Sequence, residues 1–103
     1  MLTFEKVLEI FKDYLALDTE LEVCKSRYGY IRVEYNEIED IPDYCSGVVC
    51  RTPEELFDIL LDDLQVYEEI RLTEGQRDIT AEDLETLRVL RQRYLERREE
   101  EMK

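Results

Sequence analysis

The stretch from residue 52 to residue 72 limits the fold of this chain more than any other, because it joins a strong helix start to a wide apolar surface. Thr52 can cap the helix, Pro53 suits its first turn, and Glu55 completes a capping box three residues after the cap. Gly75 is typical of a residue just past a helix end. We therefore predict one long central helix over about residues 53–72.

The apolar side chains of this helix cover an arc of roughly 220° at about 100° per residue, far wider than the stripe of a helix with one packing partner. They are Leu56, Phe57, Ile59, Leu60, Leu61, Leu64, Val66, Tyr67 and Ile70. Asp63 and Arg71 interrupt the arc. A helix this apolar must contact two surfaces, so we expect it at the centre of the fold.

The other elements follow from their hydrophobic periodicity and turn residues. In chain order we expect a helix over residues 3–17, a strand over 20–25, a turn at 26–29, a strand over 30–35, an acidic loop over 36–43, a third strand over 44–51 and a last helix after Thr80. The order α-β-β-β-α-α predicts an α+β fold with a small antiparallel three-stranded sheet packed on helices. A chain of 103 residues suits a single domain, here 1–103, and we expect its tail to fray from about residue 97.

Residues 30–35 form the clearest strand. Ile31, Val33 and Tyr35 alternate with more polar neighbours, so one face is apolar and the other amphipathic. We expect the first and central helices to cover the apolar face, and the last helix to pack on the free side of the central one. Pro42 excludes an ordinary central strand, and Gly47 is expected to interrupt the third strand.

The last helix carries arginines inside its apolar stripe. Leu87, Arg91, Tyr94 and Arg98 keep heptad spacing. Two interpretations stay open: the arginines bridge to acids of a neighbouring helix, or the helix forms a homodimer seam.

Charge excludes whole classes of partner. The net charge is −13, there is no His, and charged residues make up 40% of the chain against roughly 25% in average domains. A phosphate backbone or an anionic membrane surface would repel such a chain, so we expect no direct nucleic-acid binding and no membrane binding. The N-terminus lacks a signal peptide and no window is long and apolar enough to span a membrane, so we expect a cytoplasmic protein.

The sequence offers little for catalysis, and we predict no enzyme, no cofactor and no metal site. Without any His there is neither an imidazole base for a cysteine nucleophile nor a Ser-His-Asp set. Adjacent acid pairs such as Asp62-Asp63 diverge on a helix and are interpreted as surface groups. The three cysteines, Cys24, Cys45 and Cys50, are interpreted as reduced core thiols.

The strongest hint of a binding surface is a group of tyrosines and charges around the strands. Tyrosine is favoured at interfaces because it combines a large apolar ring with a polar tip. The candidate partner-binding residues are Tyr28, Tyr30, Arg32, Glu37, Glu39 and Asp40. The alternative is that the tyrosines only reflect strand propensity on a partly exposed face.

The runs Thr3-Phe4-Glu5-Lys6-Val7-Leu8 and Thr52-Pro53-Glu54-Glu55-Leu56, with a tyrosine-bearing helix, resemble small uncharacterised acidic proteins of gut Gram-positive bacteria, some associated with mobile genetic elements. The resemblance implies no activity; it favours an accessory role directed at a host or phage. We expect a non-enzymatic module that binds a protein partner. The alternative is an acidic nucleic-acid mimic that inhibits a DNA-binding protein.

Overall fold

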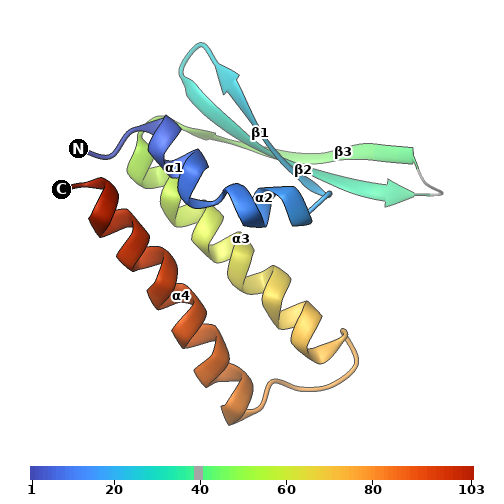
Figure 1. Ribbon diagram of the computed structural model, residues 1–103. Helices are drawn as coiled ribbons and strands as arrows, with labels where there is room; N and C mark the ends of the chain where they lie inside the picture. The colour runs from blue at the N-terminus through green and yellow to red at the C-terminus, as the bar shows by residue number, and fades with distance from the viewer. Residues whose placement is uncertain (39–40) are drawn as a thin grey trace.

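The fold class predicted from the sequence is confirmed. The computed structural model describes residues 1–38 and 41–103, and the side chains of all but residues 37–45. A three-stranded antiparallel sheet in the order β1-β2-β3 lies beside four helices (Figure 1). The elements are α1 (Phe4–Ile10), α2 (Lys12–Leu17), β1 (Leu21–Ser26), β2 (Gly29–Ile38), β3 (Ile41–Cys50), α3 (Pro53–Thr73) and α4 (Ala81–Glu101).

The expected single helix over residues 3–17 is wrong, because the chain turns between α1 and α2. Thr3 caps α1 as predicted, accepting a hydrogen bond from the amide of Lys6 at 3.1 Å. Phe11, with φ −97° and ψ 10°, then separates the two helices. Its ring is fully buried, 5.2 Å from the ring of Phe57 and 5.0 Å from that of Tyr94. Packing of this ring accompanies a break that local helix propensity does not foresee.

The predicted start signals of the two long helices are confirmed. The Thr52 hydroxyl accepts a hydrogen bond from the Glu55 amide at 3.2 Å, and Thr80 forms a full capping box with Asp83. The expected capping box of Glu55 differs in one detail: its carboxylate accepts from the Arg51 amide, at 3.0 Å. α3 ends where expected, since Glu74 and Gly75 both take positive φ.

The hairpin between β1 and β2 lies where the sequence placed it. Ser26 pairs with Gly29, whose φ is +143°. A side chain at Gly29 would collide with the carbonyl oxygen of Cys50, so only glycine fits the position where β2 meets the end of β3.

The loop expected over residues 36–43 is wrong, because β2 and β3 continue through most of it. Ile38 pairs with Ile41, and Glu37 pairs with Pro42. Pro42 is tolerated because β3 is an edge strand, paired only with β2. The expected break at Gly47 is also wrong: Gly47 pairs with Val33, and the register shifts between Glu34 and Tyr35 instead.

The helices cover the opposite face of β2 from the one predicted. The ring of Tyr30 lies 4.6 Å from that of Phe4 in α1, and Arg32 pairs with Asp63 of α3. Residues opposite each other in an antiparallel pair share a face, so the covered face includes Leu21 and Cys50, which are both buried. Ile31, Val33 and Tyr35 lie on the outer face. The apolar residues of the two neighbouring strands thus outweigh the pattern of β2 itself.

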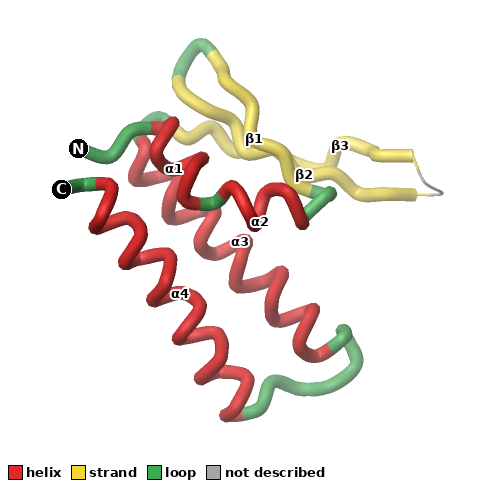
Figure 2. The backbone as a smooth tube through the Cα atoms, viewed as in Figure 1, coloured by secondary structure: helices red, strands yellow, loops and turns green. Residues whose placement is uncertain are grey.

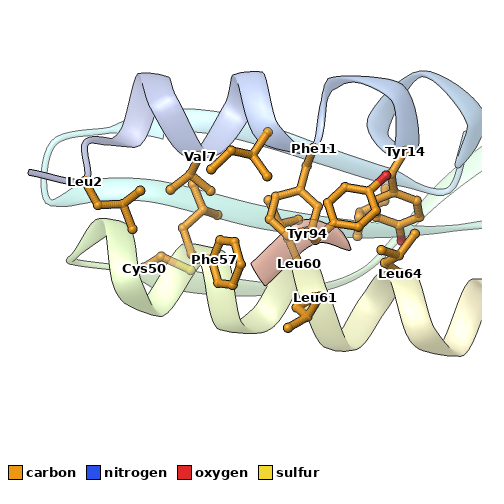
Figure 3. Close-up of a cluster of buried hydrophobic side chains, with 13 residues drawn as sticks. Leu2, Val7, Phe11, Tyr14, Cys50, Phe57, Leu60, Leu61, Leu64 and Tyr94 are labelled. Carbon is orange, nitrogen blue, oxygen red and sulfur yellow. The ribbon is translucent and has the colours of Figure 1, made fainter. Parts of the chain in front are cut away.

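The core lies between α1, α2 and the N-terminal half of α3, with Tyr94 entering from α4 (Figure 3). α4 packs on α3 and α1, on the side of α3 away from the sheet, as predicted (Figure 1). It is helical to Glu101, whose carbonyl accepts from the Lys6 ammonium at 2.8 Å. Fraying from about residue 97 concerns motion and stays a prediction.

The heptad stripe of α4 is used within the chain. Leu87 and Tyr94 are buried, Arg91 donates to the Gln65 side chain at 2.6 Å, and the Arg98 guanidinium lies 4.6 Å from the centre of the Phe57 ring. A homodimer through these four residues would have to displace the contacts that join α4 to the rest of the fold.

Candidate functional site

A groove opens where α3 moves away from the sheet. Figure 2 shows the C-terminal half of α3 running away from the strands, with α2 at one end of the space between them. A cavity of about 620 Å³ lies there, bounded by α2, the segment that follows it, the first two strands and α3. We call this cavity and its walls the α2–α3 groove.

One wall of the α2–α3 groove is aliphatic and uncovered. Leu17 of α2 is 63% exposed, and Val66 and Ile70 of α3 are 54% and 58% exposed. Val66 and Ile70 lie one helical turn apart and so share a face of α3. Single exposed aliphatic side chains are common on proteins, but three that line one hollow form an apolar surface of the kind that binds ligands or partners.

The floor of the groove is an ion pair. The guanidinium of Arg32 donates to both carboxylate oxygens of Asp63, at 2.9 and 2.6 Å, and the two side chains are only 11% and 16% exposed. The hydrogen bond to Asp63 raises the pKa of Arg32. Burial raises the pKa of Asp63, and Arg32 opposes that rise. The two-bond geometry is that of an ionised pair, so the two charges offset each other.

A second polar contact closes the α2 end of the groove. The buried Tyr14 hydroxyl donates to the Asp18 carboxylate at 2.7 Å, and burial, followed by this bond, raises the pKa of Tyr14. The other oxygen of Asp18 accepts from the amide of Glu20 at 3.2 Å. Asp18 therefore anchors the chain between α2 and β1.

Four polar side chains that line the groove are hydrogen-bonded to one another in pairs. The pairs are Arg32 with Asp63 and Tyr14 with Asp18. Among the described residues, no group of three or more His, Cys, Asp or Glu side chains is placed to hold a metal ion.

None of the helices in residues 1–38 and 41–103 is long and apolar enough to cross a membrane.

The two tyrosines of the predicted patch have different surroundings. Tyr28 is 69% exposed at the tip of the first hairpin. Tyr30 packs its ring on Phe4 and on the core, which is a structural role that its sequence position did not reveal.

The charged residues of that patch do not join the tyrosines. Arg32 lies on the floor of the α2–α3 groove. Glu37 lies near the far end of β2, opposite Pro42, and its side chain is not among those described. Glu39 and Asp40 lie outside the described residues. Tyr28 and Glu37 thus stand toward opposite ends of the sheet, and the binding role of the six residues stays a prediction.

Sequence reasoning missed Val66 and Ile70 because it counted the whole arc of α3 as core. One signal was present: Asp63 interrupts that arc at a position between Ile70 and Leu56. A carboxylate on an otherwise apolar surface indicates that a polar partner, or an incompletely covered surface, lies opposite.

The outer face of the sheet is a second partly apolar surface. Ile31 is opposite Cys24 on β1 and Val49 on β3, and Val49 is 44% exposed. The Tyr35 hydroxyl donates to Glu22 on this face at 2.9 Å. The helix contacts described above all lie on the other face of the sheet.

All three cysteines lie on strands: Cys24 on β1, and Cys45 and Cys50 on β3. Cys50 is buried in the core, and burial raises its pKa. The prediction of a core thiol is wrong for Cys24, which is half-buried on the outer face of the sheet; burial raises its pKa as well. Both shifts favour the neutral thiol over the reactive thiolate. The side chain of Cys45 is not among those described.

Comparison of the chain with protein-family models, with curated proteins and with solved structures finds no match. The resemblance to acidic proteins of gut bacteria stays a prediction.

Proposed function

We propose that this chain is a non-enzymatic protein-binding module, and that the α2–α3 groove receives an apolar segment of its partner. The observation that carries the proposal is the exposure of Leu17, Val66 and Ile70 around one cavity. Each would gain roughly 25 cal/mol for every Å² of apolar surface that a partner removes from water. The proposed setting is the cytoplasm, where the thiols would remain reduced.

The polar floor supports the same proposal. Because Arg32 and Asp63 satisfy each other, an apolar side chain entering the groove does not leave a new charge unpaired. The pair is also held by Glu34, which accepts from Arg32 at 3.3 Å. A fixed, internally satisfied floor under an aliphatic wall orders few groups on binding and so favours affinity.

A nucleic-acid mimic is the second candidate, and one observation favours it. Glu54, Asp58 and Asp62 are exposed at successive turns of α3 and form an acidic row. The row is too short to imitate a phosphate backbone. At its C-terminal end, Arg91 of α4 lies 3.5 Å from Asp62. The arginine partly neutralises that end of the row.

Capture from a host lysate with matched variants separates the two candidates. The wild-type chain, Ile70→Ser in the groove and Val89→Ser on α4 would be compared; Val89 is 48% exposed and lies outside the groove lining. The proposal expects a partner that Val89→Ser retains and Ile70→Ser loses. Capture that Ile70→Ser leaves intact, and that duplex DNA or moderate salt abolishes, would instead support the mimic.

A further inference from the structure

The two walls of the α2–α3 groove differ in charge. Leu17, Val66 and Ile70 line it from the helices. Glu20 and Glu34 line it from the strand side, where Glu34 is opposite Leu21 in the register of β1 and β2. The groove therefore presents an apolar side and an acidic side to whatever enters it.

The negative charge of the acidic side is not cancelled within the groove. Arg32 is committed to Asp63 through two short bonds, and its bond to Glu34 is longer, at 3.3 Å. Glu34 uses one oxygen, Oε2, for Arg32 and for the Ser46 hydroxyl, and among the described residues Oε1 has no hydrogen bond. Its side chain is 43% exposed. Glu20 is exposed as well.

The second arginine of the groove is also engaged elsewhere. Arg71 donates to Glu68, one turn back on α3, at 2.8 Å. This bond raises the pKa of Arg71 and keeps its charge beside the carboxylate of Glu68. The charge that remains for a partner at the mouth of the groove is thus negative, in line with the net charge of −13 for the whole chain.

The aliphatic side has the spacing of a helix-binding surface. Val66 and Ile70 stand four residues apart on α3 and form a ridge against which a second helix can place its own i, i+4 stripe. Leu17, from the end of α2, bounds the same hollow. An extended segment would pair with a strand edge through its backbone, whereas Leu21, Arg32 and Glu34 line the groove from the face of the sheet that the helices cover.

We propose that the occupant of the α2–α3 groove is a cationic amphipathic helix of a partner protein, with its aliphatic stripe on Val66 and Ile70 and a lysine or arginine beside Glu34. This inference rests on the proposed function and adds the chemistry of the partner. The acidic side excludes an anionic helix by like-charge repulsion and attracts a cationic one, which sets specificity and association rate.

A display library of short helices tests the inference directly. In the library the stripe positions vary between aliphatic and polar residues, and the flanking positions vary among Lys, Gln and Glu. Selection against the wild-type chain should enrich helices with an aliphatic stripe at i, i+4 and Lys at a flank. Enrichment of Glu or Gln at the flanks would overturn the inference.

Variants of the chain then locate the bound helix. Ile70→Ser and Val66→Ser should each weaken a selected helix by roughly tenfold, the effect of about 1.4 kcal/mol of lost apolar contact. Glu34→Gln should weaken it by about two- to fivefold, as for an exposed ion pair, and reduce its salt dependence. Val89→Ser, the matched control, should change neither affinity nor salt dependence.

The outcomes distinguish the inference from the function on which it rests. If Ile70→Ser weakens the selected helices but Glu34→Gln does not, the cationic partner is ruled out and the groove remains a binding site. Helices that ignore Ile70 and Val66 would overturn both. A small cationic amphiphile that displaces helices with a polar stripe as readily as helices with an aliphatic stripe is a further outcome. That result would show that the groove is a small-molecule site and would overturn the inference. Because the altered side chains are about half exposed, matching urea midpoints for all variants would confirm that the fold is intact.

Discussion

The two halves of α3 share one apolar arc but differ in how much of it is buried. Between residues 56 and 64 of α3, five apolar side chains are at most 4% exposed: Leu56, Phe57, Leu60, Leu61 and Leu64. In the C-terminal half Val66 and Ile70 are more than half exposed. The first half lies among α1, α4 and β3, whereas the second continues past the point where the sheet covers it (Figure 1). An apolar arc therefore predicts a surface suited to burial, but it does not predict which segment or partner covers that surface.

The largest expected effect is in the buried half. Leu60→Ala should lower the free energy of unfolding by about 2–5 kcal/mol, because Leu60 is 0% exposed and truncation leaves a cavity. Ile70→Ala, the same kind of truncation in the other half, should cost less than about 1 kcal/mol. Urea melts of both variants measure the contrast. Equal losses would mean that the two halves of α3 are equally buried in solution.

The boundary between the halves is the Arg32–Asp63 pair. Asp63→Asn should cost about 1–3 kcal/mol, because it weakens hydrogen bonds between charged groups that are mostly buried. Replacing both partners by apolar residues, as in Arg32→Met with Asp63→Leu, should recover most of that loss, since neither charge is then left unpaired. A double variant less stable than the single one in urea would show that the pair stabilises the fold outright.

The start of the buried half should be less sensitive. Thr52→Ala should cost about 0.5–2 kcal/mol, because it removes the acceptor for the Glu55 amide. Denaturant melts would detect it, and Thr52→Ser, which keeps the hydroxyl, is the control. If the alanine variant matched the wild type, the cap would contribute nothing and packing alone would hold this end of α3.

The exposed half is held by the connection to α4, and this connection should depend on pH. Arg77 donates to Asp83 at 2.6 Å and to the carbonyl of Leu72, the residue before the end of α3, at 2.8 Å. The hydrogen bond from Arg77, and then that from the Thr80 amide, lower the pKa of Asp83 below its usual range. Ionised Asp83 therefore stabilises the fold above the pKa of the unfolded chain, about 4, and this stabilisation is lost as the pH falls further.

Asp83→Asn tests this contribution. The difference in unfolding free energy between wild type and variant should be largest near neutral pH and should shrink as the pH falls below about 4. Chemical melts across that range measure it. A difference that stays constant with pH would mean that the Arg77–Asp83 contact is not formed in solution.

Local signals were read correctly from the sequence because their physical causes lie within a few residues. Thr52 and Thr80 cap the helices that follow them, Gly29 takes the positive φ of its turn, and the order of helices and strands follows from their periodicity. Each of these depends on a hydrogen bond or a backbone conformation that involves only near neighbours in the chain. The candidate binding residues were harder to predict, because the exposure of a side chain depends on contacts between segments that are distant in the sequence.

Three features were decided only by the tertiary structure. The helix of residues 3–17 breaks at Phe11, whose ring packs against Phe57 and Tyr94. β2 presents Arg32 rather than Val33 to the helices, because the buried residues of β1 and β3 select that face. The arc of α3 stays uncovered at its C-terminal end, which creates the groove. Each of these three features depends on which distant segment packs against the residues concerned. A sequence pattern shows only that a surface is apolar, not which segment contacts it.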